Sequence, residues 1–208
     1  MMEFLDEESL REENLHETRI PMPGDFDTMQ VRIAGIEPES FVDGPGIRLT
    51  VFTQGCKHNC LECHNPQTHD FKGGHLISLA EILSMIEENP LLDGVTFSGG
   101  DPLEQAEALV PLAREIKERG LNLVIFTGYV FENILSRREQ YPHMYELLTF
   151  ADMLVDGPFV LSKRCLDLKF RGSRNQRLID VPMSLSQGRA VLHPIQLQEM
   201  QDRPDLFE

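Results

Sequence analysis

Basic residues are scarce in this sequence. Its 208 residues include 19 Lys and Arg against 34 Asp and Glu, which gives a formal net charge of −15 at pH 7. Affinity for nucleic acid comes mainly from neutralising phosphates with Lys and Arg, and anionic membranes need basic surfaces for the same reason. The charge balance therefore argues against nucleic acid and membrane as partners.

Long apolar runs are also missing. No stretch approaches the roughly 20 apolar residues that a membrane helix needs. The acidic residues 1–8 lack the basic and apolar regions of a signal peptide. We therefore expect a cytoplasmic protein.

Cysteine is rare, with four residues, and three of them are bunched at Cys56, Cys60 and Cys63 while Cys165 stands far away. This arrangement does not suit a disulfide scaffold, and in a reducing compartment it indicates a metal site. We expect Cys165 to be an inert loop or core residue, because lone thiols usually are.

Composition divides the chain into three parts. Residues 1–28 are rich in acidic side chains and poor in large apolar ones, which is typical of a partly disordered arm. Residues 29–182 form the expected single catalytic domain. Residues 183–208 form a C-terminal tail, polar enough from residue 193 onward to be loosely held.

Hydrophobic periodicity predicts an α/β fold with parallel strands. We expect strands at residues 31–36, 47–52, 94–98, 123–126 and 153–156. We expect one helix that is capped by Ser78 and further helices at residues 104–119, 131–138 and 141–150. Alternation of strand and helix implies βαβ units, whose ligands bind at the carboxyl ends of the strands. The candidate motifs follow such ends: the cysteines, Gly99-Gly100-Asp101-Pro102, Thr127-Gly128-Tyr129 and Gly157-Pro158.

The cysteine spacing leaves two kinds of metal site open. Three thiolates on one loop suit a 4Fe-4S cluster in which one iron has no protein ligand. Zinc is the alternative, since His58, His64 or His69 could complete a tetrahedron with the thiolates. If the site holds a cluster, His58 and His64 lie within its loop and could tune it through hydrogen bonds.

The segment Gly55-Cys56-Lys57-His58-Asn59-Cys60-Leu61-Glu62-Cys63-His64-Asn65-Pro66 resembles the Cys-x-x-x-Cys-x-x-Cys loop of the radical S-adenosylmethionine (SAM) superfamily. The resemblance implies that Cys56, Cys60 and Cys63 hold a 4Fe-4S cluster whose free iron chelates SAM. It also implies that one electron cleaves SAM to methionine and a 5'-deoxyadenosyl radical, and that Glu62, Cys63 and His64 lie beside the adenine.

The stretch Ser98-Gly99-Gly100-Asp101-Pro102-Leu103 is similar to the Gly-Gly-Glu-Pro motif of the same superfamily. The similarity implies that Gly99 and Gly100 offer backbone carbonyls to the SAM ammonium group, with the Asp101 carboxylate favouring its charge. Thr127 is the remaining expected SAM contact.

Three further stretches resemble particular groups within this superfamily. Residues 41–48 resemble the glycyl-radical-enzyme activases, and residues 155–159 and 170–177 resemble the activating proteins of anaerobic (class III) ribonucleotide reductases. This likeness covers about residues 30–182. It implies a short, incomplete (βα) barrel, open on one side, that abstracts a hydrogen atom from a glycine of the reductase's glycyl radical subunit, with flavodoxin or ferredoxin as electron donor.

Two other functions remain open. A pyruvate formate-lyase-type activase shares the cysteine motif, but those enzymes carry Asp-Thr-Asn-Gly where this chain has Phe126-Thr127-Gly128-Tyr129. A zinc-stabilised, noncatalytic α/β binding module is the alternative from a different class. The arginines of residues 171–177 form a cationic island that could hold the SAM carboxylate, dock a partner or simply be solvated.

Overall fold

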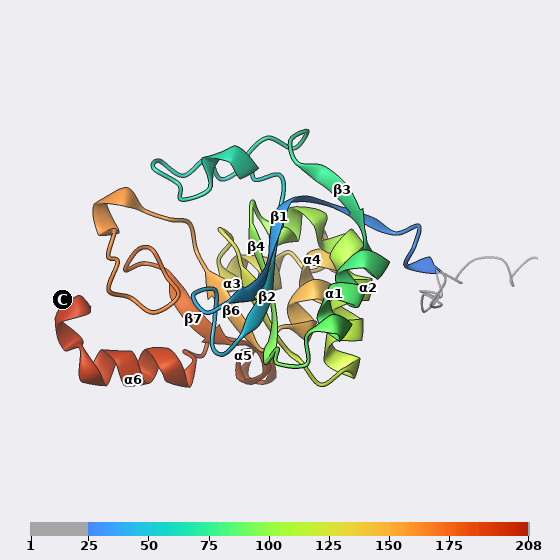
Figure 1. Cartoon of the computed structure of the whole chain (residues 1–208). Helices are drawn as coiled ribbons and strands as arrows, with labels where there is room; N and C mark the ends of the chain where they lie inside the picture. The colour runs from blue at the N-terminus through green and yellow to red at the C-terminus, as the bar shows by residue number, and fades with distance from the viewer. Residues whose placement is uncertain (1–24, 208) are drawn as a thin grey trace, which may run out of the picture.

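The computed structural model describes residues 25–207, whose strands form one sheet in the order β3-β1-β2-β4-β5-β6-β7 (Figure 1). The strands are β1 (Gln30–Ser40), β2 (Arg48–Thr53), β3 (His75–Ser78), β4 (Gly94–Gly99), β5 (Asn122–Phe126), β6 (Met153–Asp156) and β7 (Arg177–Asp180). The helices are α1 (Leu79–Glu88), α2 (Ala106–Glu118), α3 (Phe131–Ser136), α4 (Pro142–Phe150), α5 (Val181–Gln187) and α6 (Pro194–Asp202). Short 3-10 turns include η2 (Pro66–Thr68), η3 (Pro102–Gln105), η4 (Leu161–Lys163) and η5 (Pro204–Leu206).

Four parallel strands form the centre of the sheet. Strands β2, β4, β5 and β6 run parallel to one another. On one side β1 pairs antiparallel with β2, and β3 pairs antiparallel with β1. On the other side β7 pairs antiparallel with β6. The sheet does not close, since β3 and β7 stand at its two ends. This architecture confirms the predicted incomplete α/β barrel.

Helices α1, α2 and α4 cover one face of the sheet (Figure 1). Helix α1 begins where predicted, at a capping box in which Ser78 Oγ accepts from the Glu81 N–H and the Glu81 carboxylate accepts from the Ser78 N–H. Its buried side chains, Leu79, Ile82, Leu83 and Ile86, repeat at helical spacing. The main core therefore lies between these helices and the sheet.

Strands β3 and β7 were not predicted from the sequence. In β3, His75 and Leu76 are exposed, and in β7 only two apolar residues stand between Arg177 and Asp180. Neither pattern indicates a strand by itself. Each segment is extended because a neighbour, β1 or β6, supplies its hydrogen-bonding partners.

The two ends of the chain differ in what can be described. The predicted arm lies outside the described residues apart from 25–28, a turn in which Phe26 is buried. The tail expected to be loosely held from residue 193 onward contains α6 and η5, and α5 precedes it. The polar character of α6 was misleading, because Gln196 and Glu199 are buried and hydrogen-bonded to the backbone of residues 169–178.

Candidate active site

A cavity of about 600 Å³ lies at the carboxyl ends of the parallel strands. Segments that follow four different strands contribute to its wall, as the sequence analysis expected. They include Cys56, Cys60, Cys63 and His64 after β2, Gly99 and Gly100 at β4, Thr127 and Gly128 after β5, and Gly157, Pro158 and Phe159 after β6. The fold thus brings together motifs that are up to a hundred residues apart in sequence.

The three bunched cysteines are free and partly exposed, and all three line this cavity. Burial raises the pKa of Cys56 to about 11 and also raises that of Cys60, so both thiols favour the protonated form. Iron binds the thiolate, and its positive charge reverses that preference. Among residues 25–207, no three His, Cys, Asp or Glu side chains converge as a ready site for one metal ion. A 4Fe-4S cube takes each thiolate on a different iron and does not require such convergence.

Two glycines hold the end of β4 against the cysteine loop. The Gly100 N–H donates to Thr53 O at 2.7 Å, and the Asp101 N–H donates to Gly55 O at 2.9 Å. A Cβ atom on Gly100 would lie 2.5 Å from Gly55 O, and Gly99 has a left-handed φ of +91°. Only glycine allows this close approach, which leaves the backbone exposed along the cavity.

Asp101 is fully buried and does not itself line the cavity. Its carboxylate lies 2.8 Å from His58 Nε2 and accepts from the Thr127 hydroxyl at 2.9 Å. It also accepts from the N–H groups of Gly128 and Leu103, both at 3.0 Å. The structure therefore places Asp101 behind the cavity wall, where it joins three segments. Its expected direct role toward SAM stays a prediction.

The other expected SAM residues divide between the cavity and the surface. Cys63, His64, Gly99, Gly100 and Thr127 line the cavity, whereas the Glu62 side chain is exposed and outside it. Glu62 has a left-handed φ of 56°, which marks a sharp turn directly before Cys63.

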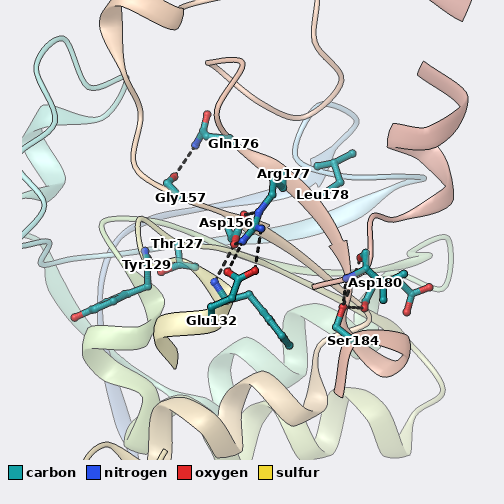
Figure 2. A network of polar contacts seen from close by, with 12 residues as sticks. Thr127, Tyr129, Glu132, Asp156, Gly157, Gln176, Arg177, Leu178, Asp180 and Ser184 are labelled. Atoms are coloured by element: carbon teal, nitrogen blue, oxygen red, sulfur yellow. Dashed lines mark hydrogen bonds and ion pairs between the residues drawn. The ribbon is translucent and has the colours of Figure 1, made fainter. Parts of the chain in front are cut away.

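The loop of residues 157–176 forms the opposite wall. The Phe159 ring meets His64 edge to face with a centroid distance of 6.1 Å. Figure 2 shows Gln176 Nε2 donating to Gly157 O at 3.1 Å, a bond that closes the loop at its base. This wall therefore lies directly against the cysteine loop.

Two arginines of the predicted cationic island, Arg171 and Arg177, form ion pairs within the chain. Arg177 bonds the carboxylates of Asp156 and Glu132 (Figure 2), and these bonds hold its pKa above the ordinary range. Arg171 pairs with Glu199, and Arg174 Nε donates to Leu206 O at 2.7 Å. Arg171 and Arg177 therefore pair with carboxylates of the chain, whereas Arg174 is exposed and bonds a backbone carbonyl. A role of these arginines toward SAM or a partner stays a prediction.

Sequence reasoning missed Arg48, whose side chain is fully buried. Its guanidinium donates to Thr96 Oγ1 and Val95 O, both at 2.6 Å, and to Pro45 O at 3.0 Å. Burial lowers its pKa to about 10. Arg48 thereby anchors residues 41–46, of which Phe41, Val42 and Asp43 line the cavity. A lone charge within an apolar strand was the available signal.

Residues 42–179 match the family model of the 4Fe-4S single cluster domain. The anaerobic ribonucleoside-triphosphate reductase-activating protein of Enterobacteria phage T4 is 33% identical over 150 residues, which is 69% of this chain and 90% of that protein. Its counterpart in Haemophilus influenzae is 30% identical over 149 residues, 67% of this chain and 91% of that protein. The chain belongs to this radical SAM family of activating proteins.

The pyruvate formate-lyase-activating enzyme of Clostridium pasteurianum is 44% identical over 108 residues, but the match covers only 45% of that enzyme and 49% of this chain. Membership of the activating-protein family implies a 4Fe-4S cluster and SAM as cofactors. The site fits both, with three free thiols and a glycine-lined edge on one cavity. Within residues 25–207, no helix has the length and apolarity to cross a membrane.

Proposed function

We propose that this protein is an activase that generates the glycyl radical of an anaerobic ribonucleotide reductase. One observation carries the choice of partner. The match to the activating proteins of that reductase extends over 90% and 91% of the two relatives described above. The match to the pyruvate formate-lyase-activating enzyme stops at 45% of its length.

In this proposal Cys56, Cys60 and Cys63 hold the cluster. Bound together, the cluster and SAM supply one-electron reductive cleavage of the sulfonium bond, the chemistry that starts hydrogen abstraction from glycine. The backbone of Gly99 and Gly100 accepts the SAM ammonium group. Residues 62–64 lie beside the adenine, and Thr127 contacts SAM from the next strand end.

The surrounding protein orients SAM and excludes water. The sheet is open between its two ends, which suits a substrate that is a loop of another protein. Flavodoxin or ferredoxin as electron donor, and a cytoplasmic location, are parts of the same proposal.

Electron paramagnetic resonance tests the partner. The reconstituted protein, SAM and a reductant are incubated without oxygen with the anaerobic reductase or with pyruvate formate-lyase from the same cell. We expect the glycyl doublet on the reductase alone. Cys60→Ala should abolish both the doublet and the bound iron. Cys165→Ala is the matched control for iron and should retain it, because Cys165 does not line the cavity and packs against Leu168 and Leu206.

The 44% local identity makes pyruvate formate-lyase the second candidate partner. A doublet on the lyase alone would contradict the reductase assignment and support this alternative. A colourless protein with one zinc and no iron after anaerobic reconstitution would instead support the noncatalytic zinc module.

A further inference from the structure

The C-terminal segment of residues 181–207 folds onto the wall of the cavity. It follows the stretch 42–179 that matches the family model. In Figure 1, α6 lies beneath the loop that precedes β7. Side chains of this segment form hydrogen bonds and apolar contacts with that loop, so the segment contacts the cavity wall from outside.

Glu199 makes the central contact. Its side chain is 3% exposed, and one carboxylate oxygen accepts from the Lys169 N–H at 2.6 Å while the other accepts from Arg171 Nη2. A buried carboxylate persists only where donors of this kind satisfy it. Both donors belong to the cavity-wall loop, residues 157–176.

Two further contacts flank Glu199. On one side, Gln196 Oε1 accepts from the Leu178 N–H at 2.7 Å. On the other, Leu206 accepts from Arg174 and packs against Leu168. The segment therefore holds the loop at two separate places, around Glu199 and around Leu206, and holds the adjoining strand β7 through Gln196.

The loop depends on such support because it has little regular structure. Between β6 and β7 it contains only the turn η4 and one isolated bridge, Arg164 to Ser173. Yet it supplies many cavity-lining residues, namely Gly157, Pro158, Phe159, Leu166, Leu168, Phe170, Arg171, Gly172 and Gln176. Its position sets the shape of one side of the cavity.

The guanidinium of Arg171 is not exposed to the cavity. Its side chain has no exposed surface, although the residue as a whole is 7% exposed, so its accessible atoms are backbone atoms. The guanidinium also lies over the Phe207 ring at 5.8 Å. Arg171 therefore ties the loop to the C-terminal segment and presents main chain to the cavity.

We propose that Glu199 is a positioning residue for SAM binding, acting through Lys169 and Arg171 to hold the cavity wall in place. The proposal rests on the proposed function of this cavity. It assigns residues 194–207 to the active site. The cysteines lie on a different loop, so loss of Glu199 should impair SAM binding while cluster assembly survives.

Hydrogen exchange of the apoprotein tests directly whether Glu199 holds the cavity-wall loop in place. Glu199→Ala should raise amide exchange in residues 157–176 and leave the amides of β2, β4 and β5 protected. Glu199→Gln keeps an acceptor for Lys169 and should give a smaller rise. Gln198→Ala is the matched control, because Gln198 is an exposed neighbour that bonds only Asp202. Unchanged exchange in residues 157–176 of Glu199→Ala would overturn the proposal.

Steady-state cleavage of SAM with a chemical reductant tests whether Glu199 contributes to SAM binding. Glu199→Ala should raise the KM for SAM about tenfold with a smaller change in kcat and an unchanged iron content. Equal KM values for Glu199→Ala and Gln198→Ala would overturn the role in SAM binding. A native protein that fails to cleave SAM would contradict the proposed function, whereas the exchange result on the apoprotein would still stand.

Discussion

At the scale of single residues, Asp101 joins segments that are distant along the chain. His58 of the cysteine loop lies within hydrogen-bond distance of the Asp101 carboxylate. Thr127 and Gly128, at the end of β5, donate hydrogen bonds to the same carboxylate. Hydrogen bonds to a charged group contribute about 1.5–3 kcal/mol each, more than neutral ones. The Tyr129 ring supports the same junction by meeting His58 edge to face at 4.7 Å. The relative position of the motifs is therefore fixed by buried polar contacts.

Replacing Thr127 by Val should lower the free energy of unfolding by about 1–3 kcal/mol, because the buried Asp101 carboxylate would lose a donor at unchanged side-chain size. Guanidinium denaturation of the apoprotein measures the change. Thr149→Val is the control, since the Thr149 hydroxyl is exposed and bonds only Glu146 O. Its effect should stay within about 0.5 kcal/mol. Similar losses in both variants would contradict the role given to Asp101.

At the scale of elements, α6 begins at an unusual cap. His193 Nδ1 accepts from the Ile195 N–H at 3.2 Å, which requires an unprotonated nitrogen. Burial lowers the pKa of His193, an effect that the Asp180 carboxylate partly opposes. The partial positive charge of a helix N-terminus also disfavours a protonated imidazole. Protonation should therefore weaken the start of the helix that carries Glu199.

The sign of the pH effect follows from that lowered pKa. Between the folded-state pKa and the ordinary value of about 6.5, the unfolded chain binds more protons at His193 than the folded chain does. The stability contributed by the cap is thus complete above about pH 6.5 and is lost as the pH falls toward the folded-state pKa. His193→Asn keeps a capping acceptor that does not titrate.

Denaturation at pH 7.5 and pH 5.5 measures this dependence. The native chain should lose more stability between these pH values than His193→Asn does, and the comparison cancels the contributions of the other six histidines. An equal loss in both proteins would show that the cap does not titrate in this range.

At the scale of the whole molecule, excess negative charge is the dominant electrostatic feature. The formal net charge is −15, and several cations are already paired internally, among them Lys117 with Asp152 and Arg177 with Asp156. Uncompensated carboxylates repel one another more strongly in the folded state, where they lie closer together. Folding therefore works against this repulsion.

Salt should consequently stabilise the protein. Raising KCl from 10 to 150 mM shortens the Debye length from about 30 to about 8 Å, so repulsion between surface carboxylates is screened. We expect Tm to rise by a few degrees, measured by calorimetry on the apoprotein at pH 7.5. Sucrose of matched osmolality is the control for nonspecific effects. A fall in Tm would mean that attractive surface pairs such as Lys57 with Glu104 outweigh the repulsion.

The sequence by itself determined the features that depend on neighbouring residues. The Ser78 cap, the apolar repeat of α1 and the apolar runs of the parallel strands are local patterns, and each forms the element that its periodicity predicts. The spacing of the cysteines fixed them on one loop. Because parallel strands present their carboxyl ends at one edge, these local patterns also implied that the motifs meet around one cavity.

Only the tertiary structure decided how distant residues satisfy one another. The burial of Asp101 depends on partners from the cysteine loop and from the end of β5, and the extended state of β7 depends on pairing with β6. The polar residues around Glu199 indicated a loose tail, yet Glu199 itself is buried because Lys169 and Arg171 supply its partners. The free energy of burying a polar group depends on its partner, and a partner thirty residues away leaves no periodic signal in the local sequence.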